Sequence, residues 1–162
     1  MANMTVSVSR PYKGDTAPLQ YGLVGYTDIR AASVEYYSYK GAIMMLDVSD
    51  VDGYAQPMQL NLTVASGDVF LGIALEEVQV KAADTAQGDK KITVATEGVW
   101  GFLVGSTGIT VTDIGDLAYA SDDQTITVTT TNNLWVGQIV AVDATYIWVD
   151  IKLAAGREVA QV

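Results

Sequence analysis

The sequence predicts an all-β protein with a compact β-barrel-like or β-sandwich core of short antiparallel strands and an extended N-terminal arm. Three observations lead to this fold class. Short stretches that alternate apolar and polar residues recur from Val69 to Leu153, as in half-buried strands. Glycine and Asp or Asn residues separate these stretches, which is typical of tight turns. No long apolar pattern of period 3.6 occurs, so helix is expected in no more than a turn or two.

Length and charge limit the domain count and the partners. A chain of 162 residues with 49% hydrophobic side chains can form one domain with its own core. We expect an arm over residues 1–30, a β core over residues 31–153 and a tail over residues 154–162. The net charge of −10 repels phosphate backbones and anionic lipid surfaces. Nucleic acid and membranes are therefore not expected partners.

The chain contains no His and no Cys. These are the side chains that most often perform chemistry near neutral pH. Their absence favours a protein that binds a surface over an enzyme, and no cofactor is expected. The high apolar share with only 17% charged residues indicates that apolar surface is covered by partners.

The first 30 residues differ from the rest. Thr5–Ser9 alternates like a strand, and Arg10–Asp15 interrupts it. We interpret this segment as a docking arm, with an integral first strand and a surface loop as the alternative. An arm of this kind adds a strand to a neighbouring sheet edge, meets acidic groups with its cations and buries an aromatic ring. The candidate partner-binding residues are Thr5, Val6, Val8, Arg10, Tyr12 and Lys13.

Two strand-rich stretches are expected before the main series. Ser33–Asp47 is rich in β-branched and aromatic residues, and a second strand is expected over residues 58–66. The polar loop Asp47–Pro57 between them contains Asp47, Asp50 and Asp52, which suggests a calcium site. The EF-hand register fails because position twelve would be Gln59. A plain polar turn is the favoured interpretation.

The main series alternates buried and half-buried strands. Val69–Leu75 and Val99–Val104 are nearly continuous apolar runs, as in strands buried on both faces. Between and after them, shorter strands are expected around Ile92, Ile109, Leu117–Ala120 and Ile126. The series closes with Leu134–Val142 and Tyr146–Leu153, joined by Asp143-Ala144, a gap of hairpin length. Lys81–Asp89 is the only stretch that suits a helical turn.

Side-chain direction follows from strand alternation. In the last strand Ile147, Val149, Ile151 and Leu153 share a core face. The run Val69–Ala74 resembles Leu134–Val140, and each has one glycine in mid-strand. Such a glycine marks a bulge or a close backbone approach.

Paired carboxylates and the tryptophans have ordinary structural interpretations. Glu76-Glu77 and Asp122-Asp123 are adjacent, so on a strand the members of each pair point to opposite faces. We therefore interpret them as turn and edge charges. The three tryptophans could line a sugar-binding face, but packing is the commoner use; they are Trp100, Trp135 and Trp148.

The order of glycine-centred strands resembles a known family. The residues are Gly72-Ile73-Ala74, Ile92-Thr93-Val94, Gly98-Val99-Trp100-Gly101, Ile114-Gly115-Asp116-Leu117-Ala118-Tyr119, Ile126-Thr127-Val128-Thr129, Val136-Gly137-Gln138-Ile139-Val140 and Ile147-Trp148-Val149-Asp150-Ile151. Over residues 40–153 this order is similar to the small capsid cement (head decoration) proteins of tailed bacteriophages.

The resemblance implies a structural virion protein without enzymatic activity. It implies a location on the outer face of the capsid, binding to the major capsid protein, a homotrimer and reinforcement of the expanded head. Two other classes stay open. One is a carbohydrate-binding or adhesive β-module on a virion or cell surface, and the other is a small β-rich hydrolase.

Overall fold

The structure is a computed structural model that describes residues 4–7, 10, 12–13, 20–22, 35–47, 55–60, 63–81, 90–105, 107–155 and 157–158. Every strand pairing among these residues is antiparallel. The regular structure of this part of the chain is strand and 3-10 turn, without an α-helix. The predicted all-β fold is confirmed.

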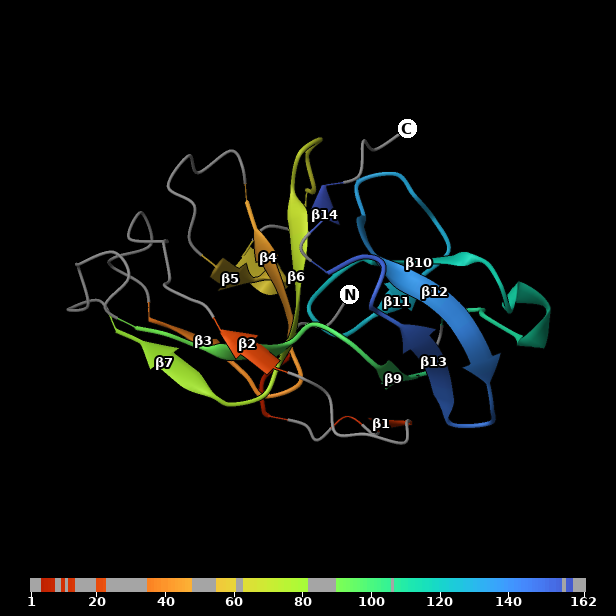
Figure 1. Cartoon of the computed structure of the whole chain (residues 1–162), viewed down its shortest axis with the longest axis horizontal. Coiled ribbons are helices and arrows are strands. Elements are labelled where there is room, and N and C mark those ends of the chain that lie inside the picture. Colours follow the sequence, from red (N-terminus) through yellow and green to blue (C-terminus); the bar gives the residue numbers. More distant parts are fainter. Residues whose placement is uncertain are drawn as a thin grey trace.

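Two sheets and a two-stranded ribbon make up the fold (Figure 1). The C-terminal sheet has the order β1 (Tyr12–Lys13), β9 (Val99–Leu103), β13 (Tyr146–Asp150), β12 (Leu134–Val142), β10 (Leu117–Ala120) and β11 (Ile126–Thr127). The N-terminal sheet has the order β2 (Gln20–Gly22), β8 (Thr93–Ala95), β6 (Val69–Ala74), β4 (Ile43–Leu46) and β5 (Ala55–Pro57), and β14 (Arg157–Glu158) also pairs with β6. The ribbon pairs β3 (Tyr36–Ser38) with β7 (Val78–Val80).

The two sheets share one topology. In chain order, the C-terminal sheet contributes β9, β10, β11, β12 and β13, and the N-terminal sheet contributes β2, β4, β5, β6 and β8. In space the first strand of each set pairs with the fifth, the fifth with the fourth, the fourth with the second and the second with the third. The core of the protein is therefore an internal structural repeat.

A glycine occupies the same place in both copies. Gly72 of β6 pairs with Met44, and Gly137 of β12 pairs with Ala118. One residue later on the partner strand, the register shifts in both sheets, which is a β-bulge. A Cβ on Gly72 would lie 2.2 Å from a backbone oxygen of β8, and one on Gly137 would lie 2.2 Å from a backbone oxygen of β13. The predicted close backbone approach is confirmed at both positions.

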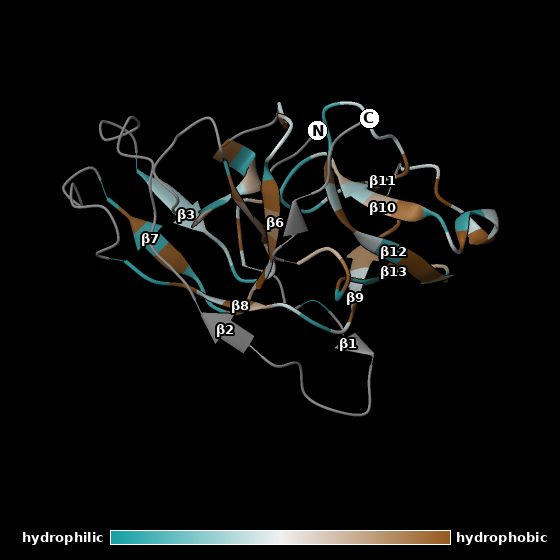
Figure 2. Ribbon diagram, turned by 45° about the horizontal axis from the view of Figure 1, so that its top comes forward, coloured by the Kyte–Doolittle hydropathy of each residue, from teal (hydrophilic) through white to brown (hydrophobic). Residues whose placement is uncertain are grey.

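Two apolar clusters hold the sheets. The larger joins one face of the N-terminal sheet, including Ile43 and Phe70, to the inner face of the C-terminal sheet, including Ile139 and Val149. The smaller joins the other face of the N-terminal sheet to the ribbon and to Met4. Figure 2 shows the apolar segments of β6 and β7 in brown. The N-terminal sheet is thus covered on both faces.

Several predicted strand boundaries agree with the structure. Leu117–Ala120 and Leu134–Val142 are strands over the predicted residues. Ile147, Val149 and Ile151 are buried as expected. Leu153 was expected in the core but is 53% exposed. The reason is that β13 ends at Asp150 and the chain turns away.

Three other strand predictions are wrong. The alternation around Ile109 and Val111 is not a strand, because Val111–Asp113 is a 3-10 turn (η4). Met58–Leu60 is also a 3-10 turn (η3), and residues 63–66 are in no strand. Residues 4–7 are in no strand either, so the Thr5–Ser9 strand is not formed over that part. Val8, Ser9 and the predicted helical turn beyond Lys81 lie outside the described residues.

Candidate functional site

The N-terminal candidate residues lie in different surroundings. Thr5 and Val6 are exposed, and 64% of Val6 is accessible. Tyr12 and Lys13 form β1, which pairs with Trp100 and Val99 of β9. Val8 lies outside the described residues. Among the candidate side chains that the structure describes, Thr5 and Val6 therefore face outward.

The segment is fastened to the core on either side of the exposed residues. The side chain of Met4 is buried, with 3% exposed, and its N–H donates to Asp123 Oδ1 at 2.9 Å. The hydroxyl of Ser7 accepts a hydrogen bond from the Lys40 N–H at 3.0 Å and donates one to the Glu77 carboxylate. These contacts join the segment to the turn before β4 and to the loop before β7.

Arg10 is a core-facing cation. Its Nε donates to the Gly41 carbonyl, its terminal nitrogen lies 3.5 Å from the Asp123 carbonyl oxygen, and its guanidinium carbon lies 4.2 Å from the centre of the Phe102 ring. The residue is half-buried. The sequence suggested that Arg10 meets acidic groups on a partner, whereas the structure gives it acceptors within the chain.

One acceptor, the Asp123 carbonyl, comes from the turn between β10 and β11, and the other, the Gly41 carbonyl, comes from the turn before β4. Asp122 and Asp123 lie in a turn as predicted, but both are fully buried, so their interpretation as edge charges is wrong. Asp122 Oδ1 accepts the N–H groups of Gln124 at 2.9 Å and Thr125 at 2.7 Å, which closes the turn. The Asp123 carbonyl accepts the Ile43 N–H at 2.9 Å. This turn of the C-terminal sheet is therefore bonded to β4 of the N-terminal sheet.

Burial dominates the electrostatics of this junction. The pKa of Asp123 is raised to about 6, first by burial and also by the neighbouring Asp122 charge, while the Met4 N–H and Arg10 act in the opposite direction. Burial also lowers the pKa of Arg10 to about 10, against the attraction of Asp123 and Asp122. Arg10 stays protonated at neutral pH and partly compensates the two carboxylates.

This junction can stabilise the fold, but a substrate has no access to its carboxylates. A substrate cannot reach two carboxylates whose residues are fully buried. One oxygen of each carboxylate has no hydrogen-bond partner among the described residues. Burying such atoms costs free energy unless an opposite charge is near. Arg10 supplies that charge and so lowers the cost of burying this turn. We therefore assign Arg10, Asp122 and Asp123 to holding the two sheets together.

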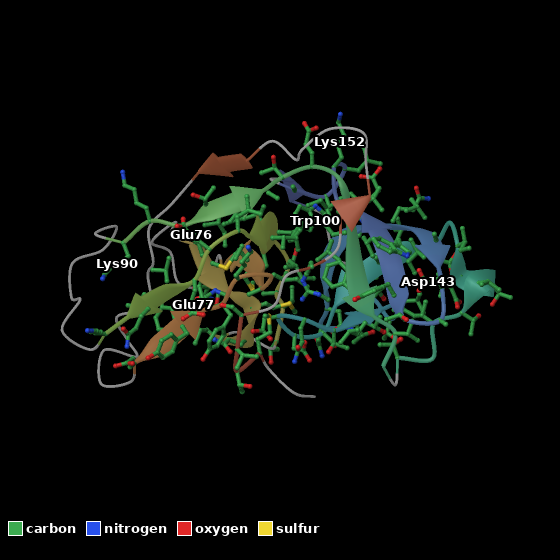
Figure 3. All side chains as sticks on the ribbon, turned by 90° about the horizontal axis from the view of Figure 1, so that it is seen from below. Glu76, Glu77, Lys90, Trp100, Asp143 and Lys152 are labelled. Atoms are coloured by element: carbon green, nitrogen blue, oxygen red, sulfur yellow. The ribbon has the colours of Figure 1, made fainter. Side chains whose placement is uncertain are left out.

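The tryptophan side chains are used within the fold. The indole N–H of Trp100 donates to the Glu97 carbonyl at 2.9 Å, that of Trp135 to the Gly137 carbonyl at 3.0 Å and that of Trp148 to Asp143 Oδ2 at 2.7 Å. Figure 3 places Trp100 toward the middle of the molecule, whereas Lys152 points outward. This arrangement favours packing over sugar stacking.

No group of three or more acidic side chains is close enough to hold a metal ion within the described part of the chain. Asp47 is buried, and its Oδ2 accepts a hydrogen bond from Gln56 Nε2 at 3.3 Å. The other two aspartates of the suggested calcium loop lie outside the described residues. The described residues also include no helix of the length and apolarity that crossing a membrane requires.

Among the described residues, most of the exposed large apolar side chains lie in the C-terminal half of the chain. Apart from Val6, the large ones are Leu103, Val111, Ile114, Leu117, Val128, Val140 and Leu153. All of them belong to the C-terminal sheet, to its connections or to the turn after β13. The sequence did not indicate this set, because alternation marks which residues share a face but not which face stays uncovered.

Comparison with known proteins gives no relative: no protein-family model, no curated protein and no solved structure matches this chain.

Proposed function

We propose that this protein is a structural virion component that binds the outer surface of the major capsid protein lattice and stabilises the expanded head. The observation that carries the proposal is the set of exposed apolar side chains in the C-terminal half of a strongly acidic chain. Leu103 and Val111 are each 64% accessible. Exposed apolar groups gathered in one region mark a surface that binds a protein.

The proposal also rests on the order of glycine-centred strands, which resembles the cement proteins of tailed bacteriophages. It includes a homotrimer on the capsid and excludes nucleic acid, membranes and enzymatic turnover from the role of this protein. An acidic, rigid β-body suits attachment to the outside of a shell, where affinity for DNA would serve no purpose.

The test is cosedimentation of the purified protein with empty heads of the same phage, before and after expansion. The expected result is saturable binding to expanded heads at a fixed ratio to the major capsid protein, together with a higher temperature of head disruption. Saturable binding without any effect on head stability would reduce the proposal to attachment alone. No binding to expanded heads would contradict it.

The carbohydrate-binding alternative has a separate test. A glycan array probed with the same protein is expected to show no binding, because the three indole N–H groups are already bonded within the fold. Glycan binding that is lost on replacement of Trp135, the half-buried tryptophan, would favour the alternative.

A further inference from the structure

The internal repeat shows which face of the C-terminal sheet lacks a cover. When the two sheets are matched at Gly72 and Gly137, the buried residues Ile43, Met45, Phe70, Ile73 and Ala95 correspond to Leu117, Tyr119, Trp135, Gln138 and Asp150. Each of the first five is at most 1% exposed, because this face of the N-terminal sheet packs in the larger core cluster.

The corresponding face of the C-terminal sheet points outward. Leu117 is 47% exposed, where its counterpart Ile43 is fully buried. Gln138 is exposed, where its counterpart Ile73 is 1% exposed. The inner face of the same sheet, with Ala118, Ile139 and Val149, fills the core. One copy of the repeat thus buries a face that the other copy leaves open.

Strand register extends this face across four strands. Leu103 of β9 pairs with Tyr146 of β13, and Gly101 pairs with Trp148. The Tyr146 and Trp148 rings lie 5.5 Å apart. We define the outward face by Leu103, Leu117, Gln138, Tyr146, Trp148 and Asp150. Trp148 is only 6% exposed and Tyr146 and Asp150 are half-buried, so Leu103, Leu117 and Gln138 are the exposed side chains of this face. Since Leu103 and Leu117 are three strand spacings apart, the face is about 14 Å wide.

Charge around the outward face is mostly negative, although Lys13 of β1 is in register with Val99 and Asp150. Between residues 97 and 155 the only basic residue is Lys152, and it lies 3.7 Å from Glu97. Asp116 directly precedes β10 and is exposed, and Asp143 lies at the tip of the β12–β13 hairpin (Figure 3). Asp150 lies on the face itself. A face with exposed leucines at its two sides and mostly acidic groups around them favours a basic partner.

We propose that the outward face docks on a patch of the major capsid protein that offers apolar contacts to Leu103 and Leu117 and is lined by Lys and Arg, an inference that rests on the function proposed above. A second copy of this chain is disfavoured as the occupant, because it would bring a further net charge of −10 to an acidic rim. The N-terminal sheet also has a face that corresponds to the inner face of the C-terminal sheet. That face is buried as well, because the ribbon packs on it.

The experiment measures binding of variants to expanded empty heads. The double variant Leu103→Gln with Leu117→Gln removes apolar contacts at the two sides of the face. Asp116→Lys reverses one rim charge and leaves the backbone hydrogen bonds of Asp116 in place. Val128→Gln is the control, since Val128 is 40% exposed but lies beyond the face at the edge strand β11. All four residues are exposed, so melting temperatures are expected to stay within about 2 °C of wild type.

We expect the double variant to bind heads at least tenfold more weakly and Val128→Gln to bind within twofold of wild type. Asp116→Lys is expected to weaken binding and to reduce its dependence on salt. Folded variants of the face that bind like wild type would overturn the docking face while leaving the proposed function standing. A wild-type protein that does not bind heads would overturn both. Loss of self-association with unchanged head binding would assign the face to a second copy and overturn the proposal.

Discussion

At the residue scale, the two mid-strand glycines are the positions that the fold constrains most tightly. Gly72 and Gly137 have φ values of +144° and +150°, which side chains rarely adopt. A backbone oxygen also occupies the place of the Cβ in both. The sequence suggested this from two similar runs, and the pairing with β8 and β13 supplies the reason.

Gly137→Ala is expected to destabilise the protein by about 1–3 kcal/mol more than Gly115→Ala. Gly115 is the matched control because it also has a positive φ, +103°, but has no atom within 4 Å of a Cβ. The first variant therefore combines strain with a clash, and the second has strain alone. Thermal unfolding measures the difference. Equal melting temperatures would contradict the close-approach interpretation.

Asp123 gives the protein a pH dependence in the acidic range. Its pKa is raised from 3.8 to about 6 in the fold, so the folded state holds the proton more tightly than the unfolded chain. The stabilising contribution is fully present below about pH 3.8 and is lost as the pH rises through about 6. The size is on the order of 1–3 kcal/mol.

Asp123→Asn is expected to remove this contribution while keeping an oxygen that can accept the Met4 N–H. The melting temperature of wild type should fall more between pH 4 and pH 6.5 than that of the variant, and the difference between the two profiles isolates Asp123. Asp116→Asn is the control, because Asp116 is exposed. Parallel profiles for wild type and Asp123→Asn would contradict the assignment.

At the element scale, the N-terminal segment is part of the folded core. Met4 and Arg10 contact the β10–β11 turn, and Ser7 and Arg10 contact the turn before β4, although the sequence suggested a docking arm. Deleting residues 2–10 is therefore expected to lower stability by about 2–4 kcal/mol, since it exposes the site of Met4 and leaves Asp122 and Asp123 without their cation. Val6→Ser, at a 64% exposed position, should change stability little. A deletion that leaves the melting temperature unchanged would restore the arm interpretation.

Periodicity predicted strands well where the chain pairs on both sides and poorly where a side chain bonds locally. Tyr146–Leu153 is an alternating run, and its first 5 residues form β13, which pairs with β12 and β9. The run around Val111 alternates too, but Thr110 and Asp113 form a capping box. Thr110 Oγ1 accepts the Thr112 N–H, and Asp113 Oδ2 accepts the Thr110 N–H at 2.7 Å. These bonds compete with a strand ladder.

The buried junction of Arg10, Asp122 and Asp123 could not be predicted from the sequence, for a different reason. Arg10 and Asp123 are 113 positions apart, and nothing in local spacing links them. Adjacent aspartates in a turn are commonly exposed, so Asp122 and Asp123 gave no sign of burial. Their burial follows from the packing of the β10–β11 turn on β4, which depends on the whole topology.

At the scale of the whole molecule, two copies of one topology are stacked so that unlike faces meet. The contact buries one face of the N-terminal sheet and the inner face of the C-terminal sheet in one cluster. The ribbon closes the remaining face of the N-terminal sheet. Among the described residues, an asymmetric stack of this kind buries both faces of the N-terminal sheet and leaves Leu103, Leu117 and Gln138 exposed on the outward face of the C-terminal sheet.

Net charge makes opposite predictions for the two kinds of association proposed for this protein. Copies that each carry −10 repel one another, so screening by salt should strengthen the homotrimer. Docking of the acidic rim on a basic lattice is an attraction, so salt should weaken it. Sedimentation velocity of the free protein and cosedimentation with expanded heads, each at about 50 mM and about 500 mM salt, measure the two responses. We expect the trimer fraction to rise and head affinity to fall over this range. A protein that stays monomeric at both salt concentrations, free and on heads, would contradict the trimer, and head binding that salt strengthens would contradict a basic partner.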